Sequence, residues 1–237
     1  MKIALISDLH ANVAALDATL TDIAKSGVDR VVCLGDIAAL GPEPREIVAR
    51  VRELDCLTIQ GNHDPTAGEE HPALRELEIW TESQLDRNDL DWLRNLPGPT
   101  TVDLEPEVAM LCVHGSPRSF DELMLAETPA QTLQDALQQR AFSVMACGHT
   151  HVQLLRRHAD CSIVNVGSVG MPFEDALFTG GPPRIYPWAE YGIVSSSAGK
   201  LAIDLRRVPY DFDRYADAVR SSSMPVREWW LDQWIHP

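Results

Sequence analysis

The first 61 residues alternate short apolar runs with amphipathic segments, and this alternation restricts the fold more than any other feature of the chain. Strand-like runs occupy 2–7, 30–35 and 56–61, and the two segments between them, 12–26 and 44–54, have helical periodicity. Strands that alternate with helices pair in parallel through right-handed crossovers. The sequence therefore predicts an α/β fold that starts from a parallel sheet.

The rest of the chain predicts further strands with fewer helices. Strand-like runs lie at 99–104, 108–113, 142–147, 152–158, 161–166, 191–197 and 200–207. Helical segments are expected as a pair within 71–97, at 129–140 and at 211–223. The Gly/Pro-rich stretch 170–190 has no periodicity and predicts a long loop, a feature that is often functional.

The chain of 237 residues is long enough to bury one sizeable core. We expect one main domain over 1–208 and a helical, Trp-rich extension over 209–237 packed on it. The tail holds Trp229, Trp230 and Trp234, half of the six tryptophans, and the last two are spaced to share a helix face. Docking on the chain's own surface, a dimer contact and a lid over a site are the three interpretations of this tail.

Charge and targeting signals limit the partners. The formal charge of −15 argues against electrostatic binding to a nucleic-acid polymer or an anionic membrane, but bound cations would still admit a small phosphorylated substrate. The N-terminal apolar run is too short for a secretory signal, and no run approaches membrane-spanning length. Five cysteines, mostly within strand-like runs, predict buried reduced thiols in a cytoplasmic protein.

Five polar clusters each follow a predicted strand: "SDLH", "GDI", "GNHD", "VHGSP" and "GHTH". Ligands of open α/β sheets bind beyond the carboxyl ends of the strands. Five of the eight histidines lie in these clusters, and the other three, His71, His158 and His236, are expected at the surface. Asp, Asn and His are also common in ordinary loops after strands, but five such clusters in series favour a shared site.

The clusters offer seven oxygen or imidazole donors, namely Asp8, His10, Asp36, Asn62, His114, His149 and His151. A catalytic zinc site generally uses three protein ligands, so seven donors are too many for one ion. If one carboxylate bridges, the same donors complete two ions, as in two-metal phosphoryl-transfer sites. The absence of cysteine from the clusters suits Mn, Fe or Zn with oxygen and nitrogen ligands.

The motif order "DLH…GD…GNHD…HG…GHTH" resembles the calcineurin-like metallophosphoesterase superfamily. "SDLHAN", "GDIAALGPEP", "WT" at 80–81, "HGSP" and "NVGSVGMP" resemble its small prokaryotic phosphodiesterase-like branch, over residues 1 to about 208. The resemblance implies a four-layer α/β/β/α sandwich, with two mixed β-sheets flanked by helices. It also implies a dinuclear metal site at the carboxyl ends of the strands.

By this resemblance, one ion is held by Asp8, His10, Asp36 and His151, and the other by Asp36, Asn62, His114 and His149. Asp36 then bridges the ions, and a hydroxide between them is the nucleophile. His63 matches the family's catalytic histidine that is not a ligand, and Asp64 is expected to orient its ring. His149 and His151, whose side chains start roughly 7 Å apart on an extended segment, are expected to take one ion each.

Charge favours a small phosphodiester substrate. Two divalent ions, two aspartates and a hydroxide leave a net charge of about +1, which matches one phosphate charge better than two. Arg118 and Asn12 are candidate substrate-binding residues, and Arg45 is a further cation near the motifs. A phosphomonoester, a dinucleoside polyphosphate or a non-catalytic metal-binding role remain the alternatives.

The sequence departs from the branch it resembles at four positions. Ala11 stands where the branch has glycine, and Val166, Met171 and Phe173 replace proline, glutamine and arginine. None of the seven metal positions is changed. Because the 166–173 segment has lost a cation, these departures concern substrate preference and not metal binding.

Overall fold

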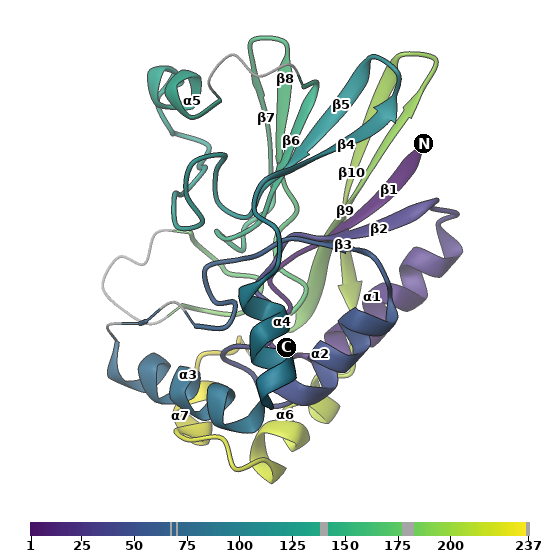
Figure 1. Cartoon of the computed structure of the whole chain (residues 1–237). Coiled ribbons are helices and arrows are strands. Elements are labelled where there is room, and N and C mark those ends of the chain that lie inside the picture. Colours follow the sequence, from purple (N-terminus) through teal and green to yellow (C-terminus); the bar gives the residue numbers. More distant parts are fainter. Residues whose placement is uncertain (67, 70, 138–141, 177–182, 236–237) are drawn as a thin grey trace.

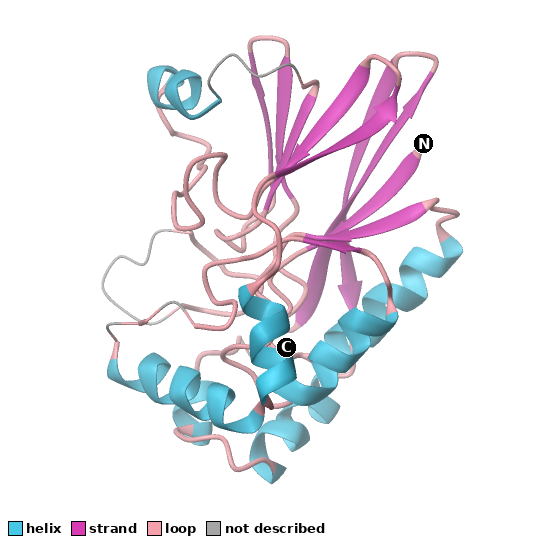
Figure 2. Ribbon diagram, viewed as in Figure 1, coloured by secondary structure: helices cyan, strands magenta, loops and turns pink. Residues whose placement is uncertain are grey.

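Two five-stranded sheets and the helices around them make up the chain (Figures 1 and 2). The structure is a computed structural model, and it describes residues 1–66, 68–69, 71–137, 142–176 and 183–235. Loops from both sheets gather in the region between the sheet edges and the helices below them (Figure 2).

The first sheet contains the predicted parallel strands and has the order β10-β9-β1-β2-β3. Its strands are β1 (Lys2–Ile6), β2 (Arg30–Cys33), β3 (Leu57–Thr58), β9 (Trp188–Ser197) and β10 (Lys200–Pro209). The first three are parallel, and β9 and β10 add an antiparallel hairpin beside β1. Helices α1 (Val13–Lys25) and α2 (Pro44–Glu53) cover this sheet, as the alternation predicts.

The second sheet has the order β4-β5-β6-β8-β7. Its strands are β4 (Thr100–Glu105), β5 (Val108–Cys112), β6 (Val144–Cys147), β7 (Leu154–His158) and β8 (Cys161–Asn165). The β5, β6 and β8 strands are parallel, and β4 and β7 run antiparallel at the edges. Helix α5 (Ala130–Leu137) packs on the outer face through Leu133 and Ala136.

Strand alternation in β1 explains how four layers form. Ala4 and Ile6 face the core beneath α1 and α2, whereas Ile3 and Leu5 face the core between the two sheets. A strand that is apolar on both faces must be covered on both. The predicted four-layer α/β/β/α sandwich is therefore confirmed.

Two predicted strand boundaries differ from the structure by more than the usual one or two residues. β9 begins at Trp188, not at 191, because its first residue pairs with Pro209 of the long hairpin partner β10. β3 is only two residues long, because its pairing with β2 stops at Thr58, before the polar loop. The predicted loop 170–190 forms an isolated bridge between Phe173 and Ile185, and its residues 177–182 lie outside the described residues.

The C-terminal segment forms helices α6 (Phe212–Ser221) and α7 (Arg227–Leu231), next to α3 (Pro72–Gln84), while α4 (Arg87–Arg94) lies nearer the first sheet (Figure 1). Trp230 and Trp234 do not share a helix face, since α7 ends at Leu231. Both rings are nevertheless buried in one cluster that also contains Leu77, so the tail docks on its own chain. The boundary at 208 and a dimer through the tail stay predictions.

Two further expectations concern reduced cysteines and the lack of a membrane-spanning segment. All five cysteines are free thiols, and four of them are buried. None of the helices in the described residues has the length and apolarity needed to cross a membrane.

Candidate metal centre

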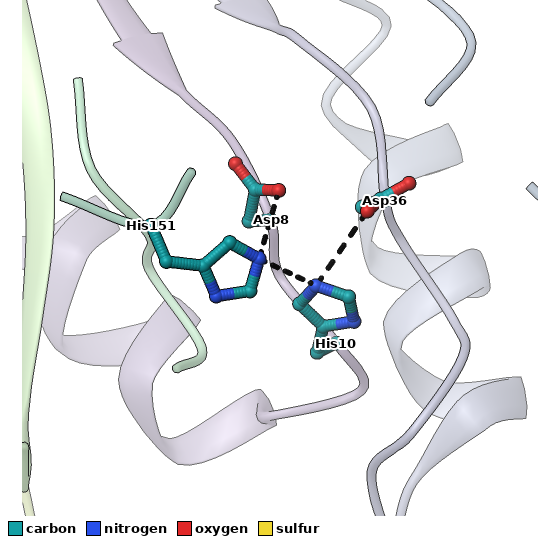
Figure 3. A group of neighbouring side chains, drawn as sticks. All are labelled: Asp8, His10, Asp36 and His151. Atoms are coloured by element: carbon teal, nitrogen blue, oxygen red, sulfur yellow. Dashed lines mark hydrogen bonds and ion pairs between the residues drawn. The ribbon is translucent and has the colours of Figure 1, made fainter. Parts of the chain in front are cut away.

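Four buried side chains converge where three loops meet (Figure 3). Asp8 and His10 follow β1, Asp36 follows β2, and His151 comes from the loop after β6. One ligand atom from each lies within 4.8 Å of those of the other three. The structure thus brings together the whole ligand set expected for the first ion.

The two histidines of this group are held from behind by backbone carbonyls. The ring Nδ1 of His10 lies 3.0 Å from the Ala39 carbonyl oxygen, and that of His151 lies 2.7 Å from the Met171 carbonyl oxygen. Because a carbonyl oxygen only accepts, each Nδ1 carries the hydrogen and donates it. Each neutral ring then presents the lone pair of Nε2 to the cluster, which is how metal-binding histidines are commonly oriented.

These lone pairs fit a bound cation. The two Nε2 atoms are 3.2 Å apart, and Nε2 of His151 is 3.1 Å from the Asp8 carboxylate. The Oδ2 atom of Asp36 is buried and has no hydrogen-bond partner among the described residues. Lone pairs and carboxylate oxygens at such distances repel one another unless a proton or a metal ion lies between them. The donor set therefore fits a divalent cation.

A second group shares Asp36 with the first. Nε2 of His114 lies 3.3 Å from Oδ2 of Asp36 and 2.9 Å from Oδ1 of Asn62, and its Nδ1 donates to the Leu34 carbonyl over 2.8 Å. The ring of His149 lies 5.2 Å from that of His114, centroid to centroid. The residues expected at the second ion thus lie together, with the carboxylate of Asp36 between the two groups.

The pKa values show a site that attracts positive charge. Burial favours the neutral form of His114, yet the carboxylates of Asp36 and Asp8 outweigh it and raise its pKa to about 10. Burial and the neighbouring His151 lower the pKa of His10 to about 3. Burial alone would raise the pKa of Asp8, but His151 and His114 hold it at about 2. The aspartates therefore stay ionised and available to a cation.

Left-handed backbone is concentrated at the expected ligands. Positive φ angles of 44 to 67° occur at Asp8, His10, Asp36, His149 and His151. Residues other than glycine rarely adopt this conformation, and such strain gathers at functional sites. Sequence reasoning missed this feature because these residues are not glycine.

Glycine is required where the backbone touches a ligand carboxylate. A side chain at Gly148 would collide with Oδ2 of Asp8 and with the hydroxyl of Ser7. A side chain at Gly61 would collide with Oδ1 of Asp36. Both glycines therefore allow close approach of two loops and do more than end a strand.

His63 lies beside the cluster without joining either ligand group. Its Nδ1 is 3.0 Å from Oε1 of Glu78 on α3, and its Nε2 is 3.4 Å from Oε1 of Glu69. Burial opposes protonation, but the charges of Asp36 and of the two glutamates prevail and raise the pKa of His63. The partner of His63 thus comes from a helix, and nothing in the local motif could identify it.

The expectation that Asp64 orients the His63 ring is wrong. Its carboxylate accepts backbone N–H bonds from Asp36 at 2.7 Å, from Gly61 at 3.0 Å and from Ile37 at 3.0 Å. Three donors from two loops converge on this buried carboxylate, and Nδ1 of His63 contacts Glu78 instead. Asp64 therefore joins the loop that carries Asp36 to the loop that carries His63.

Neither candidate substrate-binding residue is among the described residues that line the cavity beside the cluster, and both side chains have partners within the chain. Asn12 is fully buried and caps α1, accepting from the Ala15 N–H while its amide donates to the Gly170 carbonyl and to the Tyr210 hydroxyl. The guanidinium of Arg118 is paired with Glu122 and does not line the cavity beside the cluster.

The cavity at the cluster has a volume of about 520 Å³ and two unlike sides. One side carries ligand and catalytic candidates, namely His10, Asp36, Asn62, His63, His149 and His151. The other carries mainly apolar side chains, including Leu74, Leu123, Phe173, Trp229 and Trp230. We call these the ligand side and the apolar side.

The histidines outside the motifs have different surroundings. His71 is exposed as expected, but it lines the cavity and stacks on Trp229 with ring centroids 5.4 Å apart. His158 is half-buried, and its Nε2 lies 3.2 Å from Oε1 of Gln134. His236 lies outside the described residues.

A four-layer sandwich with a buried Asp/His cluster at the strand ends defines a metallophosphoesterase-like protein. The family model of the calcineurin-like phosphoesterase superfamily domain matches residues 1–180. The chain belongs to this superfamily.

Similar proteins extend over nearly the whole chain. A metallophosphoesterase structure from Sphaerobacter thermophilus is 29% identical, covers 98% of each chain and has a TM-score of 0.74. A hypothetical protein from Pyrococcus horikoshii has a TM-score of 0.79 at 23% identity, with 95% of this chain and 94% of that chain covered. An uncharacterized protein of Methanocaldococcus jannaschii is 27% identical over 96% of this chain and 94% of its own length.

Proposed function

We propose that the chain is a dinuclear metal-dependent phosphoesterase that hydrolyses a small phosphodiester. The observation that carries this proposal is the pair of ligand groups that share the buried carboxylate of Asp36, each with imidazole nitrogens facing inward. Two divalent ions in such a site activate water and stabilise the charge on the phosphoryl group.

The residues around the ions have distinct roles. Asp36 joins the two groups, and the carbonyls behind His10, His114 and His151 keep their Nε2 atoms aimed inward. His63 is assigned the transfer of a proton to the leaving oxygen, since the neighbouring carboxylates raise its pKa and favour the protonated ring. Glu78 keeps the ring in place through Nδ1.

The charges of the cavity support a diester. The charged side chains among its described lining residues, apart from the histidines, are Asp36 and Glu69, and both are acidic. Arg118 is paired with Glu122, and the Arg45 guanidinium donates to the Gln84 carbonyl. Since no described lining residue is a lysine or an arginine, a second phosphate charge has no permanent side-chain cation to meet it.

Metal analysis and a pair of chromogenic esters test the proposal. We expect two equivalents of Mn, Fe or Zn per chain, and faster turnover of bis-p-nitrophenyl phosphate than of p-nitrophenyl phosphate by Mn-loaded protein. Faster turnover of the monoester would overturn the diester preference. One equivalent of metal at saturation would overturn the dinuclear centre, and metal binding without turnover of either ester would indicate a non-catalytic module.

A further inference from the structure

The apolar side of the cavity is assembled from segments far apart in the sequence. Leu74 comes from α3, Phe173 from the segment after β8, and Trp229 and Trp230 from α7. These residues line the same cavity as the expected metal ligands, so a molecule bound at the ligand side also reaches them. A phosphate group alone is far too small to fill a cavity of about 520 Å³.

The two neighbouring tryptophans of α7 do different things. Trp230 is 1% exposed, and its indole N–H donates to the Tyr215 hydroxyl over 2.8 Å. This contact anchors α7 to α6. Trp229 is only half-buried, and it stacks on the exposed ring of His71 with 18° between the ring planes. Trp230 therefore fixes the helix, and Trp229 presents an aromatic surface to the cavity.

A second aromatic ring connects the apolar side to the ligand side. Phe173 stacks on His151, with ring centroids 4.0 Å apart and 18° between the planes. His151 is one of the four residues of the buried cluster. A group that lies on the apolar side is therefore directly beside the place where the phosphoryl group binds.

The charges of the lining residues limit the kind of chemical group that can bind at the apolar side. Glu69 is the one described acidic residue that lines the cavity outside the expected ligands, and no described lysine or arginine lines it. A second phosphate would meet repulsion, and a flexible polar chain would lose hydration without gaining partners. A flat, uncharged aromatic group loses little hydration and can pack on the aromatic rings there in an offset-stacked or edge-to-face arrangement.

We propose that Trp229 determines substrate specificity by stacking with a flat, uncharged aromatic group, such as a nucleobase, carried by the phosphodiester substrate. The C-terminal segment then forms part of the substrate site. This inference rests on the proposed function for the position of the phosphoryl group. The expected gain is that of one base stacked on one aromatic side chain, which corresponds to about tenfold or more in affinity.

Two product-like ligands that differ only in the base test the inference. Binding of AMP and of ribose 5-phosphate to the Mn-loaded full chain is measured by calorimetry for the wild type, W229A, W229F and W80A. Trp80 is the matched control. Like Trp229, it is half-buried against the hydrophobic cluster that contains Trp230, but it does not line the cavity. We expect the wild type, W80A and W229F to bind AMP about tenfold or more tightly than ribose 5-phosphate. W229A should bind the two ligands about equally, with unchanged affinity for ribose 5-phosphate.

Each outcome decides the inference. Equal affinities in the wild type, no detectable AMP binding at millimolar concentration, or a W229A variant that keeps the preference would overturn it. Metal content and turnover of bis-p-nitrophenyl phosphate are measured on the same samples. Absent turnover with an intact AMP preference refutes the proposed function alone, and normal turnover without that preference refutes the aromatic subsite alone.

Discussion

The two sides of the cavity differ in how the chain builds them. The ligand side comes from short loops that each follow a strand, such as His10 after β1 and Asp36 after β2. The apolar side comes from α3, α7 and the segment near Phe173, which meet only in the folded chain. Local sequence motifs therefore determine the chemistry of this cavity, while tertiary packing determines the shape of the substrate that fits into it.

The two sides also differ in what holds them. Four of the six ligand-side residues lie at positive φ, namely His10, Asp36, His149 and His151. Backbone groups hold several of the side chains, as the Ala39 carbonyl holds His10. Apolar-side residues are held by packing, as α7 is through Trp230 and Tyr215. Substitutions on the ligand side should therefore impair metal binding and chemistry, whereas substitutions on the apolar side should change substrate preference.

The largest effect is expected for Asp36→Asn, which tests whether the ligand side acts as one unit. Because Asp36 belongs to both ligand groups, we expect metal affinity to fall by more than the roughly 100-fold that loss of a supporting partner costs. Metal content after dialysis and diester turnover measure the effect. Asp217→Asn, at a side chain that is 79% exposed, is the matched control. Retention of both ions by Asp36→Asn would show that Asp36 does not bridge.

The next effect is expected for Asp64→Asn, which tests whether the ligand-side loops need their buried carboxylate. An amide has one acceptor oxygen and would turn its NH₂ toward backbone donors, so we expect the free energy of unfolding to fall by about 2 kcal/mol. Urea unfolding of metal-free protein measures it, with Asp91→Asn on exposed α4 as the control. Equal stability of the two variants would contradict the role assigned to Asp64.

A smaller effect is expected for Glu78→Gln, where a helix supports the ligand side. Glu78 contacts Nδ1 of His63 and accepts the N–H groups of Gly68 and Glu69, so the neutral amide should weaken the placement of the ring. We expect kcat to fall about tenfold, a part of the 10²- to 10⁴-fold that general acids contribute, with KM and metal content unchanged. Glu76→Gln, exposed on the same helix, should have no effect. Loss of metal from Glu78→Gln would instead indicate a structural role.

The four-layer sandwich follows from the family resemblance, whereas the grouping of the ligand side can be predicted for a physical reason. Strand periodicity and crossover handedness place the carboxyl ends of parallel strands at one edge, so clusters that follow different strands must meet. Asp8 and Asp36 meet in this way, whereas His151 follows β6 of the second sheet and reaches them because the two sheets pack together. The same reasoning fails for Asp64, since the direction in which a loop carboxylate turns depends on N–H groups of another loop.

The apolar side could not be predicted, because it is assembled from segments that are distant in the sequence, such as those of His71 and Trp229. Nothing local to His71 or Trp229 indicates that their rings stack. Asn12 shows that a motif can also mislead. Its place in a motif suggests substrate binding, but its side-chain oxygen caps helix α1 by accepting the Ala15 N–H. A histidine or asparagine can be assigned a role only after its neighbours in space are known.

The smallest effect is expected for glycine substitutions at two strained alanines, one beside the ligand-side loops and one in a distant turn. Ala11 and Ala198 have nearly the same left-handed φ, 50° and 51°, but Ala11 is fully buried and Ala198 is exposed in the β9–β10 turn. Alanine at positive φ is strained, so glycine at Ala198 should raise the free energy of unfolding by roughly 0.5 kcal/mol.

Glycine at Ala11 relieves the same strain but removes a buried methyl group worth about 0.8 kcal/mol, so the gain should vanish or reverse slightly. Urea midpoints of the two variants, at unchanged m values, measure the difference. If Ala11→Gly stabilised the chain as much as Ala198→Gly, the Ala11 methyl would contribute nothing to packing around the ligand-side loops. The backbone strain of Ala11 would then not be offset by any packing of its methyl group.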